Sequence, residues 1–195
     1  MELRVARRRQ SGAERRRQIL EAAERICLEE GIAALRTEKI ARRVGLSPGG
    51  IFRHYPSKRA ILTALTRALL SRLAATTPAE GAPLAWLRGF VVSRVRAFQT
   101  DPGLRLLFSP EFEHALPKAA KAELKEHLRA TWDRLVAVIE EGQRQGEIRG
   151  DLAAEELAAA VAALVQAATL PLLAEVILKS DPERVWQTVR DLLTR

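Results

Sequence analysis

The stretch GLSPGGIFRHYPSK, residues 45–58, combines three glycines and two prolines with a short aromatic and basic segment. As an isolated helix it is poor, because each glycine costs about 1 kcal/mol relative to alanine in a helix interior. Ser47 is nevertheless a good N-cap, and Pro48 is tolerated at the first helical position, where its missing N–H would have no partner. We therefore predict a short helix over 48–55 that depends on packing for its stability.

A second short helix is predicted directly before this stretch. Thr37 is a candidate N-cap for a helix that runs through Val44, and Gly45 supplies the left-handed turn that a Cβ disfavours. Two short helices joined by the turn 45–47 have the arrangement of a helix-turn-helix, although a helical hairpin with incidental glycines is an alternative. The apolar positions that would close its core are Ile40, Val44, Leu46 and Ile51.

The rest of the chain also has helical periodicity, and no stretch alternates with period two for long enough to form a sheet. The predicted fold class is therefore all-α. An apolar stripe at helical spacing predicts a first helix over 13–31, made of Ile19, Ala22, Ala23, Ile26 and Cys27. The clearest boundary is TTPAEGAP, residues 76–83, and Pro110–Pro117 is expected to be a loop or short turn. Pro171 is expected to kink the long helix predicted after residue 153.

The positive charge is concentrated in the first third of the chain. The 195 residues carry a formal net charge of +8, and residues 1–59 hold 15 Lys and Arg against 7 Asp and Glu, whereas the remainder holds 17 of each sign. This asymmetry indicates an N-terminal surface that meets a polyanion, either nucleic acid or an anionic membrane, with a solvated basic arm as the alternative. The helix-turn-helix pattern favours DNA.

Composition excludes several other classes. With 47% hydrophobic and 29% charged residues, no run of eighteen apolar residues and one cysteine, the chain is expected to be a cytoplasmic globular protein without a membrane partner. Cys27 lies in an apolar stretch and is expected to be buried. No zinc-protease, hydrolase or phosphate-loop motif is present, so we predict no catalytic residues, no metal site, no cofactor and no enzyme activity.

The N-terminal region resembles the DNA-binding domain of the tetracycline-repressor (TetR) family of bacterial transcription regulators. The resemblance covers residues 13–65 and rests on ILEAA (19–23), Gly31, Thr37, VGLS (44–47) and the aromatic-x-His-aromatic-x-x-Lys string from Phe52 to Lys58. Two positions depart from the family pattern: Phe52 stands where a tyrosine is usual, and Tyr55 where a phenylalanine is usual.

The resemblance implies a ligand-responsive regulator, most simply a repressor, that binds a palindromic double-stranded DNA operator as a homodimer and is released by a small-molecule effector. The domains expected are a basic arm over 1–12, a three-helix DNA-binding domain over 13–58, a linking helix over 57–76, and a helical ligand-binding and dimerisation domain over 84–195. A nucleoid-type DNA-binding protein that responds to no ligand is the alternative.

Physical roles can be assigned to the predicted DNA contacts. Arg53 can read a guanine edge, and Thr37 at a helix N-terminus can bind phosphate. The family resemblance implies a phosphate contact for Lys58 and a position against the DNA backbone for His54, which is alternatively packed. The full predicted set is Thr37, Ser47, Pro48, Gly49, Gly50, Phe52, Arg53, His54 and Lys58. A basic arm that either enters a minor groove or stays solvated is formed by Arg7, Arg8, Arg9, Arg15, Arg16 and Arg17.

The second half is expected to hold a largely apolar effector between its helices. Aromatic and polar side chains predicted to line that cavity are Trp86, Phe90, Phe98, Phe108, Phe112, Trp132 and Gln166, with Arg94, His114 and His127 as further polar candidates. The apolar last two helices are expected to form the dimer interface through Leu157, Val161, Leu164, Ala168, Leu172, Val185, Val189 and Leu192, each of which is alternatively part of the core of one copy.

Overall fold

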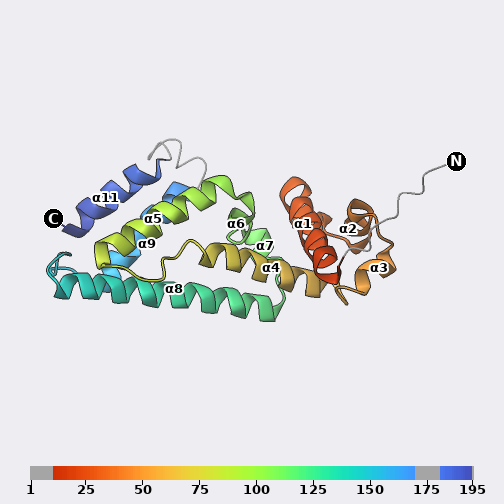
Figure 1. Cartoon of the computed structure of the whole chain (residues 1–195), viewed down its shortest axis with the longest axis horizontal. Helices are drawn as coiled ribbons and strands as arrows, with labels where there is room; N and C mark the ends of the chain where they lie inside the picture. Colours follow the sequence, from red (N-terminus) through yellow and green to blue (C-terminus); the bar gives the residue numbers. More distant parts are fainter. Residues whose placement is uncertain (1–10, 170–180, 195) are drawn as a thin grey trace.

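The computed structural model of the protein describes residues 11–169 and 181–194. These residues form an elongated, entirely helical molecule with a small head at one end and a longer body behind it (Figure 1). The predicted all-α fold class is confirmed, since no β-strand occurs within the described residues. The expected kink at Pro171 and the interface candidate Leu172 lie outside them.

Three helices and one short turn make up the head. Ser11 caps the first helix by accepting the N–H of Glu14 at 3.1 Å, and the helix ends where Gly31 adopts a φ of 81°. The elements are α1 (Gly12–Glu30), the 3₁₀ turn η1 (Ile32–Ala34), α2 (Thr37–Val44) and α3 (Pro48–Phe52).

The turn between α2 and α3 has the predicted left-handed glycine and the predicted serine N-cap. Gly45 lies in the left-handed region with φ 67° and ψ 37°, and its N–H donates to the carbonyls of Ala41 and Arg42. Ser47 then accepts the N–H of Gly50 at 3.1 Å and so caps α3, whose first residue is Pro48. The helix-turn-helix is therefore built by local backbone and cap interactions that the sequence specifies.

Some predicted boundaries shift. Helix α3 ends at Phe52 instead of residue 55, and the chain continues as a turn in which the N–H of Tyr55 donates to the carbonyl of Ile51 at 2.9 Å. Thr37 is the first residue of α2 and not its N-cap, because Arg36 occupies the cap position without a side-chain hydrogen bond. The stretch expected to be a loop at 110–117 contains a helix of six residues that Ser109 caps.

In the described part of the chain, seven helices follow the head. Helix α8 runs along the length of the body, α5 and α9 pack against it, and α11 packs against α5 (Figure 1). Their bounds are α4 (Lys58–Ala74), α5 (Pro83–Thr100), α6 (Pro102–Leu106), α7 (Pro110–Ala115), α8 (Lys118–Arg144), α9 (Ala154–Thr169) and α11 (Pro182–Thr194). The predicted boundary at 76–83 is the connection between α4 and α5, and the Nε1 of Trp86 donates to the carbonyl of Pro78 within it at 2.8 Å.

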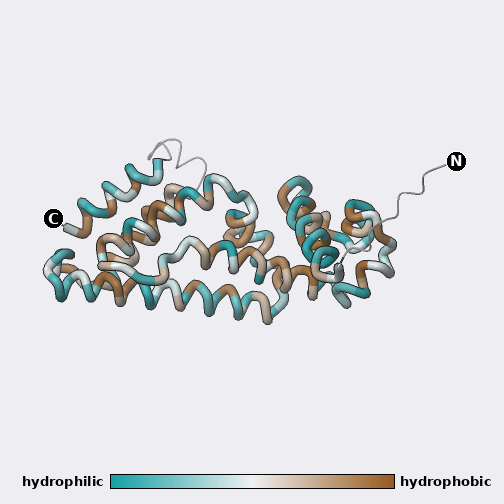
Figure 2. Tube along the Cα trace, in the orientation of Figure 1, coloured by the Kyte–Doolittle hydropathy of each residue, from teal (hydrophilic) through white to brown (hydrophobic). Residues whose placement is uncertain are grey.

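Two hydrophobic clusters hold the molecule together. The first joins the head to α4, α6, α7 and the beginning of α8, and it includes Ile40, Ile51 and Leu65, which are fully buried. The second joins α5, α9, α11 and the later part of α8. Figure 2 shows the apolar residues along the facing sides of these helices. Head and body are thus continuous through the first cluster instead of being tethered by a linker.

Cys27 belongs to the first cluster. Its side chain is 4% exposed, and burial raises the pKa of the thiol to about 11. A thiol with so little thiolate at neutral pH is a poor nucleophile, so Cys27 acts as a small apolar residue of the core, as expected.

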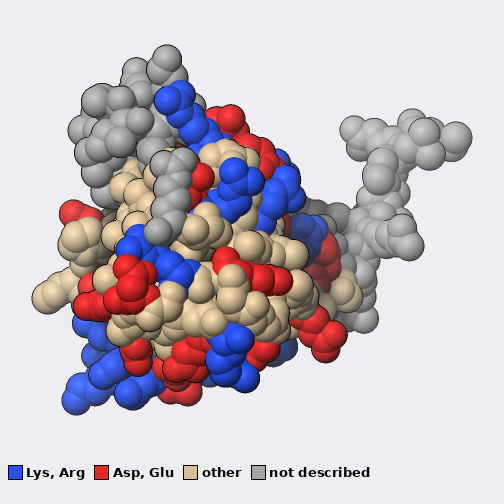
Figure 3. All heavy atoms as spheres, turned by 90° about the vertical axis from the view of Figure 1, so that its left-hand side faces the viewer, with Lys and Arg blue, Asp and Glu red and all other residues tan. Residues whose placement is uncertain are grey.

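The body has a mixed surface. At the end of the molecule away from the head, Lys and Arg side chains lie among Asp and Glu side chains (Figure 3). No helix in the described part of the chain is long and apolar enough to cross a membrane.

Candidate nucleic-acid interface and internal pocket

Helix α3 exposes one face to solvent. Ile51 points inward and is fully buried, whereas Phe52 is 49% exposed. The other exposed residues of this face and of its two ends are Ser47, Pro48, Gly49 and Arg53, and Gly50 is half-buried. An aromatic ring half open to water on a five-residue helix has no packing role of its own, so this face is available to a partner.

The two glycines of α3 differ from the glycines of the turns. Neither has a positive φ. A Cβ built on Gly49 would meet nothing closer than the Ser47 Oγ at 4.0 Å, and one on Gly50 would lie at 3.4 Å from Leu46 and Ser47, which is ordinary contact. The fold of the head therefore does not require glycine at position 49.

Several exposed cations of the head and of the start of α4 form no ion pair with another described residue. Arg53 and Lys58 are exposed and form no ion pair with any described residue, and Arg36, Arg42 and Arg59 share this state. By contrast, Lys39 pairs with Glu30, and Arg43 pairs with Glu29 at 2.6 Å. Arg36 and Arg42 were not among the predicted DNA contacts; Arg36 precedes α2, and Arg42 lies in its last turn, close to the turn at 45–47.

The remaining predicted contact residues lie around α3. Thr37 at the start of α2 and His54 after α3 are half-buried, and Lys58 begins α4 directly after its N-cap Ser57. Tyr55 packs in the first cluster, where burial raises the pKa of its hydroxyl and the charge of Arg16 opposes that shift.

The predicted basic arm divides into two parts. Arg15, Arg16 and Arg17 lie within α1, and Arg7, Arg8 and Arg9 lie outside the described residues. Arg15 donates to the carbonyl of Val44 at 3.2 Å and so ties α1 to the end of α2, while Arg17 pairs with Glu14 and Glu21 on its own helix. Arg15 and Arg17 therefore stabilise the head instead of extending from it.

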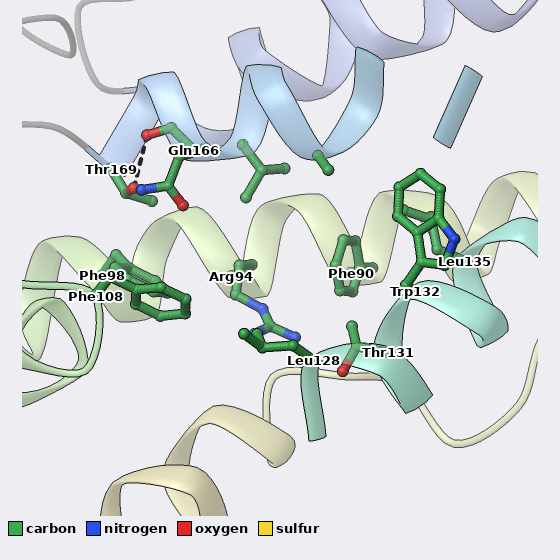
Figure 4. A pocket seen from close by; sticks show the side chains of 12 residues that line it. Phe90, Arg94, Phe98, Phe108, Leu128, Thr131, Trp132, Leu135, Gln166 and Thr169 are labelled. Carbon is green, nitrogen blue, oxygen red and sulfur yellow. Dashed lines mark hydrogen bonds between the residues drawn. The ribbon is translucent and has the colours of Figure 1, made fainter. Parts of the chain in front are cut away.

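A pocket of about 230 Å³ lies in the body between α5, α8 and α9 (Figure 4). It occupies the junction of the two clusters, since Phe98 belongs to the first and Phe90 to the second. Five of the seven predicted ligand contacts line it, namely Phe90, Phe98, Phe108, Trp132 and Gln166. The residues that complete its wall are Arg94, Leu128, Thr131, Leu135, Ala162, Val165 and Thr169.

The other two predicted contacts are packed elsewhere. Trp86 is 1% exposed and stacks on Phe90 with ring centroids 5.4 Å apart, so it supports the pocket wall from behind. Phe112 is fully buried in the first cluster. His114, a further candidate, lies near Pro117 and Lys118, on a different part of the surface.

Arg94 is the one charged side chain in the pocket wall as described. It is 6% exposed, its Nη2 donates to the Thr77 Oγ1 at 3.0 Å, and its guanidinium lies 4.9 Å from the Phe90 ring centroid. Its Nε is buried without a hydrogen-bond partner. Burial lowers the pKa of this guanidinium to about 10, so the group still carries its charge at neutral pH.

Most of the predicted interface residues are already covered within one copy of the chain. Five of them are at most 1% exposed in the second cluster: Leu157, Val161, Ala168, Val185 and Val189. Side chains in that state cannot also contact a second copy. Leu164 and Leu192 remain half-buried and keep some surface for a partner.

Comparison with known proteins connects this architecture to a family. Residues 19–65 match the family model described as bacterial regulatory proteins, tetR family. The HTH-type transcriptional repressor Rv1474c of Mycobacterium tuberculosis is 39% identical over 69 residues, which cover 35% of this chain and 37% of that repressor. The nucleoid occlusion factor SlmA of Vibrio cholerae is 28% identical over 141 residues, 69% of each protein.

Solved structures share the fold of both halves. The TetR-family transcriptional regulator PfmR from Thermus thermophilus superposes with a TM-score of 0.74 at 21% identity, over 95% of this chain and 97% of that one. AibR, solved in complex with isovaleryl coenzyme A and operator DNA, gives 0.74 at 19% identity over 93% and 98%. The helix-turn-helix head therefore matches the tetR family model over residues 19–65, and the helical fold of the whole chain is the fold of these regulators.

Proposed function

We propose that the protein is a ligand-responsive repressor that binds a palindromic operator as a homodimer. The observation that carries this proposal is that the first cluster connects two features: it packs Ile51 of α3, whose exposed side is followed by the unpaired Arg53 and Lys58, and it packs Phe98 of the pocket wall. The first suits a polyanion and the second suits a small organic molecule.

On DNA, α3 would lie in the major groove. Arg53 would donate to a guanine edge, Phe52 and Pro48 would make apolar contacts, and Lys58 would bind a phosphate. Gly49 would let the helix backbone come close to the groove wall, which explains a glycine that the fold itself does not need.

A dimer would provide the two α3 helices that a palindrome requires, about 34–36 Å apart. The surface that supports this proposal is the outer side of α9, where Ala159 and Ala163 are exposed and Leu164 is half-buried. Leu192 on α11 is half-buried as well. Small side chains allow two helices to approach closely, so this face suits a two-fold contact between copies.

The pocket and the head would be coupled through α6. The pocket residues Phe98 and Phe108 flank this short helix, which packs against both α1 and α4. Arg72 of α4 strengthens the junction, since it pairs with Glu24 of α1 at 2.7 Å and with Asp101, the N-cap of α6, at 3.2 Å. A ligand that separated the two phenylalanines would therefore shift α6, α4 and Lys58 together.

A second candidate function is nucleoid-type DNA binding without a ligand. The similarity to the nucleoid occlusion factor SlmA over 69% of each protein supports it. The two proposals differ in the use of the pocket, because a ligand-independent protein gains nothing from a cavity lined by Phe98 and Phe108.

Base reading by α3 leads to the first prediction. In binding assays on a selected palindrome, Arg53→Ala should cost about 1–3 kcal/mol and relax preference at one base position. Lys58→Ala should weaken binding to all DNA sequences equally. It should also reduce the slope of log K against log salt concentration by about one unit. Arg129→Ala, which removes the same charge from the exposed surface of α8, is the control. Unchanged affinity and base preference in Arg53→Ala would contradict the assignment of α3.

The open space around Gly49 generates the second prediction. Gly49→Ala should stabilise the head by about 0.5–1 kcal/mol, because alanine fits the helix without a clash. The same substitution should weaken operator binding, because the added methyl group would lie between α3 and the groove. Chemical denaturation and a DNA titration on the same protein measure the two effects; tighter or equal DNA binding would show that close approach at Gly49 is not used.

The outer side of α9 generates the third prediction. Leu164→Glu should convert a dimer into folded monomers, since a charge buried between copies costs several kcal/mol. Sedimentation velocity at micromolar concentration measures the change, and Glu156→Gln on the exposed start of α9 is a control that should remain dimeric. A folded monomer for the unmodified protein would exclude this part of the proposal.

The junction at Arg72 generates the fourth prediction. A compound found by thermal-shift screening should weaken operator binding about 5- to 150-fold. Saturating operator should weaken binding of the compound by the same factor. Arg72→Met should reduce this coupling while each single affinity is kept. Arg67→Met, which instead breaks the ion pair of α4 with Glu123, should leave the coupling intact. Equal ligand affinity with and without operator favours the ligand-independent function.

A further inference from the structure

Arg94 interrupts an otherwise apolar line on α5. Residues 90, 94 and 98 are spaced by four, so they lie on one face of the helix. Phe90 and Phe98 are the flanking members of this line, and both point into the pocket with Arg94 (Figure 4). A charge therefore stands where the two hydrophobic clusters would otherwise merge, and its side chain is 94% buried.

The hydrogen-bonding capacity of Arg94 is largely unused. A guanidinium has five N–H donors, of which one in this structure donates to Thr77 Oγ1 and the one on Nε has no partner. No carboxylate forms an ion pair with it among the described residues. The face of the Phe90 ring compensates part of the charge of Arg94. The ring cannot accept the hydrogen bonds that the N–H groups of the guanidinium donate in its plane.

A second unpartnered nitrogen lies close by. The Nε2 of His127 on α8 is also buried without a hydrogen-bond partner. Burial lowers the pKa of His127, and the positive charge of Arg94 lowers it further. An imidazole is neutral or positive and never negative here, so His127 cannot supply the missing negative charge.

The rest of the pocket wall offers no negative charge either. Its polar members are the hydroxyls of Thr131 and Thr169 and the amide of Gln166. Removing a charge from water without an opposite charge is unfavourable, and an apolar side chain of the same volume would pack at lower cost. Arg94 thus lowers the stability of the empty protein, and an anion that entered the pocket would offset this loss.

We propose that the effector of this protein is an organic monocarboxylate whose carboxylate group pairs with Arg94 and whose apolar tail lies against Phe98, Phe108 and Trp132. The inference rests on the proposed function, because it assigns a chemical class to the ligand of the same pocket. Planar carboxylates match the guanidinium fork, and a charge-assisted hydrogen bond is stronger than one between neutral groups.

The pocket volume indicates the size of acid that the pocket can enclose. A cavity of about 150 Å³ accommodates benzene, so one of about 230 Å³ has room for roughly nine or ten non-hydrogen atoms. Octanoate and phenylacetate each have ten. Their primary amides have the same number of atoms and nearly the same shape but no charge, so each acid has a matched neutral analogue.

The experiment compares acids with amides on the full chain. Calorimetry and tryptophan fluorescence without DNA should show at least one of the two acids binding ten times or more tightly than its amide. Arg94→Met should bring acid and amide to within about twofold of each other. Arg96 is exposed two residues along the same helix, and Arg96→Met should keep the full difference in affinity between acid and amide.

Folding stability of the ligand-free variants provides a second readout. Arg94→Met should unfold at the same or a higher denaturant concentration than the unmodified protein, because it removes an unpaired buried charge. A clearly less stable Arg94→Met would instead identify Arg94 as a structural residue and overturn the inference. Equal affinities of acid and amide, or binding of neither acid, would also overturn it.

These outcomes are separate from a failure of the proposed function. If the acids bind through Arg94 but do not change operator affinity, the assignment of a carboxylate ligand stands and ligand control of DNA binding fails. If a neutral compound binds and releases DNA while the acids do not bind, ligand control stands and the carboxylate assignment fails.

Discussion

Helix α4 buries its apolar side chains on two sides, against α1 of the head and against α6 and α8 of the body. Ile61, Leu65, Leu69 and Leu73 are at most 1% exposed, and each fully buried leucine or isoleucine contributes about 1.5–3 kcal/mol. Rotating the head away from the body would expose part of this surface. The orientation of α3 is therefore tied to α4, and any signal from the body can reach the DNA-contact surface through a packed helix.

The same core also explains the position of the pocket. The first cluster ends near Phe98 and the second begins near Phe90, and Arg94 stands between them. Arg94 lies in the pocket wall at this junction, so a charge that is costly to bury in the empty protein is also the group that we propose to bind an anionic ligand.

The helix-turn-helix and the pocket differ in how far sequence alone could predict them. Gly45, Ser47 and Pro48 act through their own backbone and neighbouring N–H groups, so the turn could be predicted from residues within a few positions. The exposed face of α3 followed once Ile51 was assigned to the core. By contrast, Trp86 and Phe90 look alike in sequence, yet one supports the pocket wall and the other lines it, because the helices that pack against α5 decide which side is open.

Neighbouring residues were enough to predict the all-α class and the helix-turn-helix, because capping, glycine turns and apolar periodicity are local properties, and a count along the chain located the excess positive charge. Only the tertiary structure decided which cations are free: Lys39 and Arg43 are neutralised by glutamates of α1, while Arg53 and Lys58 are not. It also decided that five predicted interface residues face inward and that Arg94 is buried without a carboxylate partner. Pairing and burial depend on contacts between residues far apart in the chain, and local sequence does not predict which of these residues come into contact.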